Sequence, residues 1–150
     1  MPSHLETRFL PYAAERMYAV VSDVEKYPEF LPWCRGLRVL SREQVKGNDV
    51  MRAEMLVGFG ALSEHYTSRV VLDPGACTVD VTQIEGVFRQ LETHCRFTPK
   101  GEGCQVDFSI VFEFKSRLLN AVAGKAFENV LLQMTDAFEA RAKSLPNERA

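Results

Sequence analysis

Alternating apolar and polar positions dominate the middle of the chain and predict a run of β-strands. Between Leu37 and Lys115 the hydrophobic period is close to two, and turn segments such as Asp73-Pro74-Gly75 interrupt it. We place strands at 37–45, 50–58, 62–72, 77–84, 88–98 and 104–115. Because only short turns separate them, these six strands favour an antiparallel meander over a parallel sheet.

Other patterns flank this run. An alternating stretch that ends at Leu10 predicts a first strand, and residues 13–23 have the spacing of a short amphipathic helix. Pro28 and Pro32 then restrict the backbone, so the following segment holds at most one further helical turn. Ser116 is a candidate N-cap for a helix of residues 117–144. Such a helix is about 42 Å long, because each residue adds about 1.5 Å.

Composition and charge fit one ordinary globular domain. The 150 residues are 46% apolar, with a formal charge of -2 that gives no general attraction to nucleic acid. No apolar run is long enough for a membrane span, and the N-terminus lacks the pattern of a signal or transit peptide. We therefore expect a single α+β domain over residues 1–150, with its core at about 4–145, in the cytoplasm. The four cysteines lack the spacing of a metal site and are interpreted as reduced core thiols.

One segment identifies a family. Residues 22–34, SDVEKYPEFLPWC, resemble the hallmark segment of the coenzyme Q-binding protein family, within the polyketide cyclase and START-like superfamily. Further similar blocks are YTSRV, GVFRQLETHCRF, FEFKSRLL and AFEARA, which begin at residues 66, 86, 112 and 137. Cys95 departs from the family pattern, where an aromatic residue is expected. The matching segment positions are Asp23, Val24, Tyr27, Pro28, Phe30, Leu31, Pro32, Trp33 and Cys34.

The resemblance implies both a fold and a function. The fold is the helix-grip, in which a curved antiparallel sheet wraps around a long C-terminal helix, with two short helices after the first strand. The function is binding of an isoprenoid quinone, ubiquinone above all, by a bacterial carrier or chaperone that supports respiratory electron transport and contacts the inner membrane peripherally. The same family includes ribosome association toxins that act on the large subunit, which is the alternative function. A cyclase-like enzyme is a third.

The residues themselves give little support for catalysis. His94 and Cys95 are adjacent on a predicted strand, so their side chains point to opposite faces. No zinc, phosphate-loop or nucleophile motif is present. An acid–base role would fall to residues such as Glu54, Tyr66 or His94. We predict no catalytic residues, no metal site and no required cofactor.

The apolar residues suggest a cavity instead. The ten Phe and five Met residues either simply fill the core between sheet and helix or, where the sheet and helix enclose more volume, line a tunnel for a flexible apolar ligand. The PEFLPWC segment is interpreted either as a rigid plug at one end of the core or as a lid that exposes Trp33 at an apolar–polar boundary. The predicted cavity residues are Phe30, Leu31, Trp33, Phe59, Tyr66, Val70, Leu91, Phe108, Phe112, Phe114, Phe127, Leu131 and Met134.

A cluster of basic residues offers a second candidate site. Most of its members fall in one predicted hairpin, where they would form either an ordinary solvated surface or a patch for RNA or anionic lipid. The sequence does not separate these partners, and it leaves the oligomeric state open. The cluster contains Arg35, Arg38, Arg42, Lys46, Arg52 and Arg69.

Overall fold

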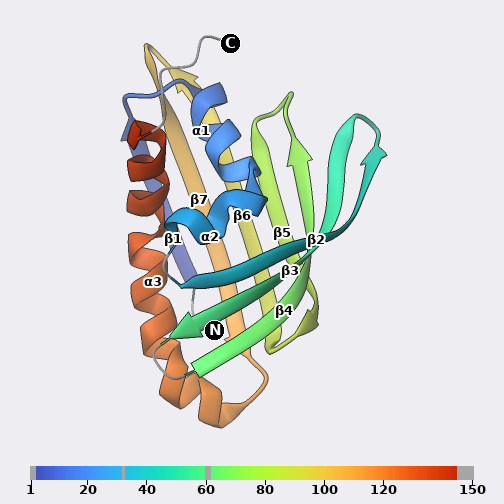
Figure 1. Cartoon of the computed structure of the whole chain (residues 1–150). Helices are drawn as coiled ribbons and strands as arrows, with labels where there is room; N and C mark the ends of the chain where they lie inside the picture. The colour runs from blue at the N-terminus through green and yellow to red at the C-terminus, as the bar shows by residue number, and fades with distance from the viewer. Residues whose placement is uncertain (1–2, 32, 60–61, 145–150) are drawn as a thin grey trace.

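The protein folds as one curved antiparallel sheet with helices on its concave side (Figure 1). The structure is a computed structural model that describes residues 3–31, 33–59 and 62–144, without the side chains of residues 59, 62, 122–128 and 130–132. The strands are β1 (Ser3–Leu10), β2 (Cys34–Val45), β3 (Asn48–Phe59), β4 (Leu62–Asp73), β5 (Thr78–Gly86), β6 (Phe88–Lys100) and β7 (Gly103–Phe114). All six predicted meander strands are thereby confirmed.

The helices follow the predicted order. They are α1 (Ala14–Ser22), the short 3-10 helix η1 (Val24–Lys26), α2 (Tyr27–Phe30) and α3 (Arg117–Ser144). Pro28 lies in the first turn of α2, where its missing N–H is not needed. Ser116 caps α3, because its Oγ accepts a hydrogen bond from the Leu119 N–H at 3.1 Å.

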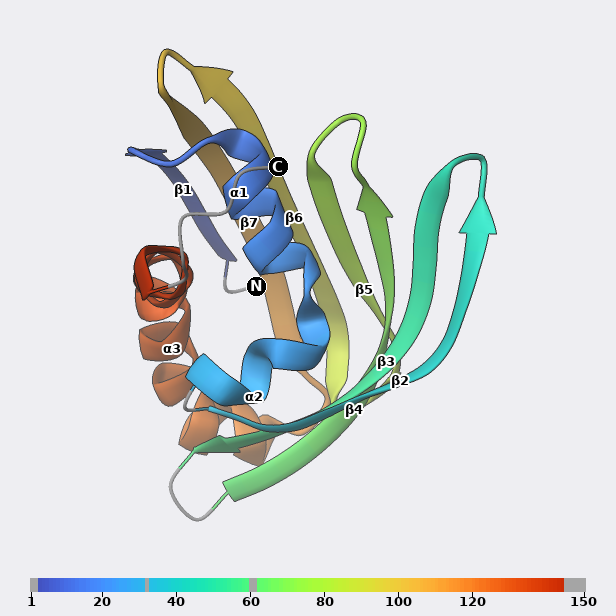
Figure 2. The same cartoon turned by 45° about the horizontal axis from the view of Figure 1, so that its top comes forward.

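The seven strands form a single sheet in the order β1-β7-β6-β5-β4-β3-β2. The first strand closes the meander by pairing antiparallel with the last, for example Leu10 with Cys104. Figure 2 shows the sheet curving around α1 and α2, with α3 along its open side. The α+β helix-grip architecture is therefore confirmed.

The core lies between the concave face of the sheet and the helices. Strand β7 shows this most clearly, because its even-numbered side chains from Cys104 to Phe114 are all buried while the odd-numbered ones are partly exposed. From α1, Met17 contributes to the same core with 1% of its surface exposed. Arg16 ties α1 to α3 by donating a hydrogen bond to the carbonyl of Ala142 at 2.6 Å.

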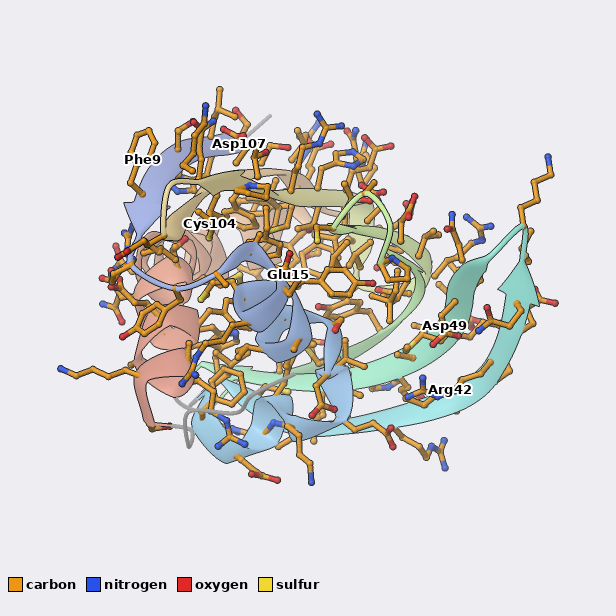
Figure 3. The ribbon with its side chains drawn as sticks, turned by 90° about the horizontal axis from the view of Figure 1, so that it is seen from above. Phe9, Glu15, Arg42, Asp49, Cys104 and Asp107 are labelled. Atoms are coloured by element: carbon orange, nitrogen blue, oxygen red, sulfur yellow. The ribbon has the colours of Figure 1, made fainter. Side chains whose placement is uncertain are left out.

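Strand β1 turns His4, Glu6 and Arg8 inward and Leu5 and Phe9 outward, and it ends at the buried Leu10. Leu5 and Phe9 are 79% and 67% exposed, and Figure 3 shows Phe9 projecting away from the body of the protein. On the other side, Arg8 forms ion pairs with Glu6 of its own strand and with Asp136 and Glu139 of α3. Within the described residues no helix is apolar enough over a sufficient length to cross a membrane.

Candidate functional site

A cavity of about 120 Å³ lies between the concave face of the sheet and helices α1, α2 and α3. Its wall is almost entirely apolar, and strands β3 to β7 contribute most of it. The helices close the other side with Met17 and Val21 of α1, Tyr27 of α2, and the segment Met134–Phe138 of α3. The polar atoms in the wall belong chiefly to Tyr27, Tyr66, Thr93 and Thr135.

The size of the cavity limits what it can hold. An apolar cavity of about 150 Å³ in a protein core is large enough to bind benzene. The present volume of 120 Å³ is somewhat smaller, so the cavity holds at most about one unsubstituted six-membered ring without widening. A tail of ten or more carbons has to extend through the opening of the cavity or widen the space beneath α3.

Six of the thirteen predicted cavity residues line this cavity. They are Leu31, Trp33, Tyr66, Leu91, Phe108 and Met134. Val70, Phe112 and Phe114 face the concave side but are buried in the packed core outside the cavity wall. The side chains of Phe59, Phe127 and Leu131 lie outside the described residues. Their part in ligand binding stays a prediction.

The PEFLPWC segment packs inward. Leu31 is 2% exposed and Trp33 9% exposed, and both line the cavity, so the expectation of an exposed Trp33 at a lid is wrong. Phe30 is absent from the cavity wall and instead contacts the rings of Tyr27 and Phe138, with centroids 6.0 and 5.6 Å away. The guanidinium of Arg141 lies over the Phe30 ring. These contacts fix α2 against the C-terminal part of α3.

Sequence reasoning missed the helix side of the cavity and several small residues. Met17 and Val21 belong to the apolar side of α1, and the amphipathic spacing of residues 13–23 predicts this buried side but not a cavity beneath it. Val79 and Val81 are the concave residues of β5, the strand whose pattern is least regular. Cys95 also lines the cavity, so a larger aromatic side chain at this position would occupy part of its volume.

The buried thiols of Cys34 and Cys95 should make the folded protein less stable at alkaline pH. Burial raises the pKa of the Cys34 thiol from 9 to about 11 and that of Cys95 to about 12. The folded state therefore keeps protons that the unfolded chain loses above pH 9. We expect the free energy of unfolding to fall from pH 9 to 11 by up to about 1.4 kcal/mol per pH unit for each thiol.

Urea unfolding at a series of pH values measures this effect. The Cys95→Ala variant should show a shallower decline than the unmodified protein, because one of the groups with a raised pKa is gone. A free energy of unfolding that stays constant from pH 9 to 11 in the unmodified protein would contradict the prediction.

The candidate acid–base residues do not come together. Tyr66 faces the cavity, whereas Glu54 and His94 lie on the outer face of the sheet. Glu54 accepts a hydrogen bond from Arg38, and His94 lies 2.6 Å from an oxygen of Asp80. Across the part of the chain that the structure describes, no group of three His, Cys, Asp or Glu side chains could hold a metal ion.

The structure divides the predicted basic cluster between two faces. Arg38, Arg52 and Arg69 share the outer face of β2, β3 and β4. Arg42 pairs with the buried Met51 and so lies on the concave side, where it binds Glu25 at 2.8 Å and Asp49 at 3.1 Å. Figure 3 shows Arg42 and Asp49 on the β2–β3 hairpin. Arg35 lies over Gly58, and Lys46 occupies the turn after β2.

Arg52 and Arg69 are a pair within this set. They are exposed and sit directly opposite each other on β3 and β4. No ion pair with an acidic side chain is present for either of them among the described residues. Two like charges in this arrangement repel each other, so the pair is open to an anionic partner.

Among known proteins, the chain is similar to relatives that are named for two different functions. The chain is 37% identical over 147 residues to the ribosome association toxin RatA of Pseudomonas aeruginosa, covering 97% of this chain and 99% of the relative. It is 40% identical over 141 residues to the mitochondrial coenzyme Q-binding protein COQ10 homolog B of Xenopus laevis, covering 91% of this chain and 56% of that protein.

A solved structure supports the architecture. A START superfamily protein from Mycobacterium smegmatis superposes with a TM-score of 0.80 at 21% identity, over 96% of this chain and 99% of the other. The model of the family described as polyketide cyclase / dehydrase and lipid transport matches residues 10–139, which include the cavity-lining residues and most of α3. With this match and the relatives above, the chain belongs to the polyketide cyclase/dehydrase and lipid transport family.

Proposed function

We propose that this protein binds an isoprenoid quinone, ubiquinone above all, with the ring in the cavity, and acts as a carrier or chaperone for it in respiration. The observation that carries the proposal is the apolar cavity of about 120 Å³, which suits one ring. The name of the Xenopus relative, a coenzyme Q-binding protein, supports the ligand class. A cytoplasmic location with peripheral contact to the inner membrane is part of the same proposal.

The energetics of apolar burial fit this role. Each buried methylene group of a tail contributes about 0.8 kcal/mol, so even a ten-carbon tail contributes on the order of 8 kcal/mol before the costs of association. A ring enclosed by the cavity wall adds to this sum. Binding therefore needs no catalytic group, and we propose a binding protein that turns nothing over.

Trp33 provides a direct test, because it is the only tryptophan in the chain and lines the cavity. Titration with 2-geranyl-1,4-benzoquinone, whose tail has two isoprene units, is expected to quench the Trp33 fluorescence and to saturate at one ligand per chain. Benzoquinone without a tail serves as the control for collisional quenching. Quenching that rises linearly and equally with both compounds would contradict the proposal.

A second candidate function is association with the large ribosomal subunit. It is favoured by Arg52 and Arg69, which are opposite each other and have no acidic partner among the described residues. Contact with RNA phosphates would relieve their mutual repulsion. The name of the Pseudomonas relative points in the same direction.

Co-sedimentation with ribosomes at several salt concentrations tests this candidate. Replacing Arg52 and Arg69 by Glu is expected to weaken association and to lower the slope of log affinity against log salt by about one for each lost phosphate contact. The Arg96→Glu variant is a matched control, since Arg96 is exposed on β6, away from this pair. Equal loss in both variants, or no association at all, would exclude this surface.

A further inference from the structure

Four residues with a hydroxyl group line the cavity, namely Tyr27, Tyr66, Thr93 and Thr135, and the hydrogen bonds of three of these hydroxyls differ in their acceptors. Tyr27 donates to the backbone carbonyl of Val21, and Thr135 donates to Glu6 Oε1 at 3.3 Å. Tyr66 donates to the thioether sulfur of Met55 at 3.3 Å. A thioether is a weak hydrogen-bond acceptor. In the unfolded chain the Tyr66 hydroxyl donates to water, a good acceptor, whereas in the folded protein it donates to this poorer one.

The ring of Tyr66 is held in place from two sides. Phe88 meets it edge-to-face with ring centroids 5.1 Å apart, and Phe88 itself stacks on Phe114 at 4.8 Å. Gly86 pairs with Tyr66 across the sheet at a φ of +146°, and a methyl group added there would lie 2.4 Å from Tyr66 Cβ. Only a glycine allows this approach. The hydroxyl is therefore presented in a fixed direction.

The same stretch of β4 contains a second polar group that lacks a partner. Ser68, two residues from Tyr66 on the concave face, is 5% exposed, and its Oγ forms no hydrogen bond within the described residues. A buried hydroxyl without a hydrogen-bond partner lowers the stability of the protein, and a bound ligand or water molecule that forms this hydrogen bond removes the cost. Ser68 lies outside the cavity wall, so of these two weakly satisfied hydroxyl groups only that of Tyr66 belongs to a residue that lines the cavity.

We infer that the Tyr66 hydroxyl leaves Met55 and donates a hydrogen bond to a carbonyl oxygen of the bound ring. This inference rests on the proposed function and names the group that selects a quinone over an isoprenoid hydrocarbon. Burial raises the pKa of Tyr66 above its ordinary value of 10, so the hydroxyl remains a donor throughout the neutral range. A carbonyl oxygen is a stronger hydrogen-bond acceptor than a thioether sulfur, so the Tyr66 hydroxyl gains free energy when it leaves Met55 for the ligand.

The test compares two ligands that differ in their ring oxygens, 2-geranyl-1,4-benzoquinone and geranylbenzene. Competition against a fluorescent apolar probe gives both affinities for each variant. Tyr66→Phe is expected to lower the ratio of quinone to hydrocarbon affinity by about 3- to 10-fold, the range of one neutral hydrogen bond. Tyr18→Phe is the matched control, because Tyr18 is partly buried but is not part of the cavity wall. It should leave the ratio unchanged.

Two further variants sharpen the result. Met55→Leu removes the competing acceptor, so it should raise the ratio, and a purely structural role of Tyr66 would not predict this rise. Thr93→Val removes the lining hydroxyl on β6 and should leave the ratio unchanged.

The outcomes separate the two proposals. An unchanged ratio in Tyr66→Phe, or a fall in Thr93→Val alone, would overturn the assignment of Tyr66 while leaving quinone binding intact. Failure of both ligands to bind the unmodified protein would overturn the proposed function together with this inference.

Discussion

Replacing Val81 by Phe is expected to weaken quinone binding by at least about a hundredfold while the protein stays folded. Val81 is on the concave face of β5 and lines the cavity, and a phenyl ring is about as large as the cavity of 120 Å³ accommodates. Excluding a six-carbon ring removes several kcal/mol of apolar burial, because each carbon contributes about 0.8 kcal/mol. The Trp33 fluorescence titration measures the loss.

The stability of this variant should show the opposite trend. Filling an existing cavity typically raises the free energy of unfolding by about 0.5 to 2 kcal/mol. Val71→Phe is the matched control, since Val71 lies on the outer face of β4 opposite Val50 and is expected to bind quinone normally. Equal affinity in the Val81→Phe variant and the unmodified protein would show that the ligand does not occupy the cavity.

Replacing Phe88 by Ala is expected to lower the free energy of unfolding by about 3 to 5 kcal/mol, the usual loss for a buried Phe. Phe88 has no exposed surface and contacts the rings of Tyr66 and Phe114. Its backbone also forms two hydrogen bonds with the side chain of Gln83, at 2.6 and 2.9 Å. Urea unfolding followed by circular dichroism measures the change.

Phe9→Ala is the control for this experiment. The Phe9 side chain is 67% exposed on the outer side of β1, so its removal should change the free energy of unfolding by no more than about 0.5 kcal/mol. Similar losses in the two variants would mean that the Phe88 cluster does not have the central place in the core that we assign to it. A large loss of stability in Phe88→Ala, with none in Phe9→Ala, would support the central position of Phe88 in the core.

The fold was readable from the sequence because its signals are local and agree with one another. The alternation of residues 104–115 predicts strand β7, and Ser116 predicts the start of helix α3; the structure contains both features. The long helix is also found with the predicted bounds, Arg117–Ser144. The segment of residues 22–34 then connected these elements to a known architecture.

The cavity was less predictable because strand alternation identifies a face but not a position along it. Phe108, Phe112 and Phe114 share the concave face of β7, yet only Phe108 reaches the cavity, while the other two pack against neighbouring side chains. Where packing leaves space depends on the helices that cover the sheet. Small residues such as Cys95 help to create this space, but a prediction that selects large apolar side chains omits them.

Arg42 was separated from the other arginines by an irregularity in β2 that the sequence did not signal. The register of β2 against β3 shifts between Val39 and Ser41. A bulge of one residue reverses the faces of all later positions, so Arg42 turns to the concave side while Arg38 stays on the outer face. Regular alternation would have placed both arginines together.

Native mass spectrometry of the protein purified from a quinone-producing host, with solvent extraction of the same sample, tests the central claim most directly. We expect one prenylquinone per chain in the unmodified protein and none in the Val81→Phe variant. An unmodified protein that is purified empty and takes up no added quinone would contradict quinone binding in the cavity.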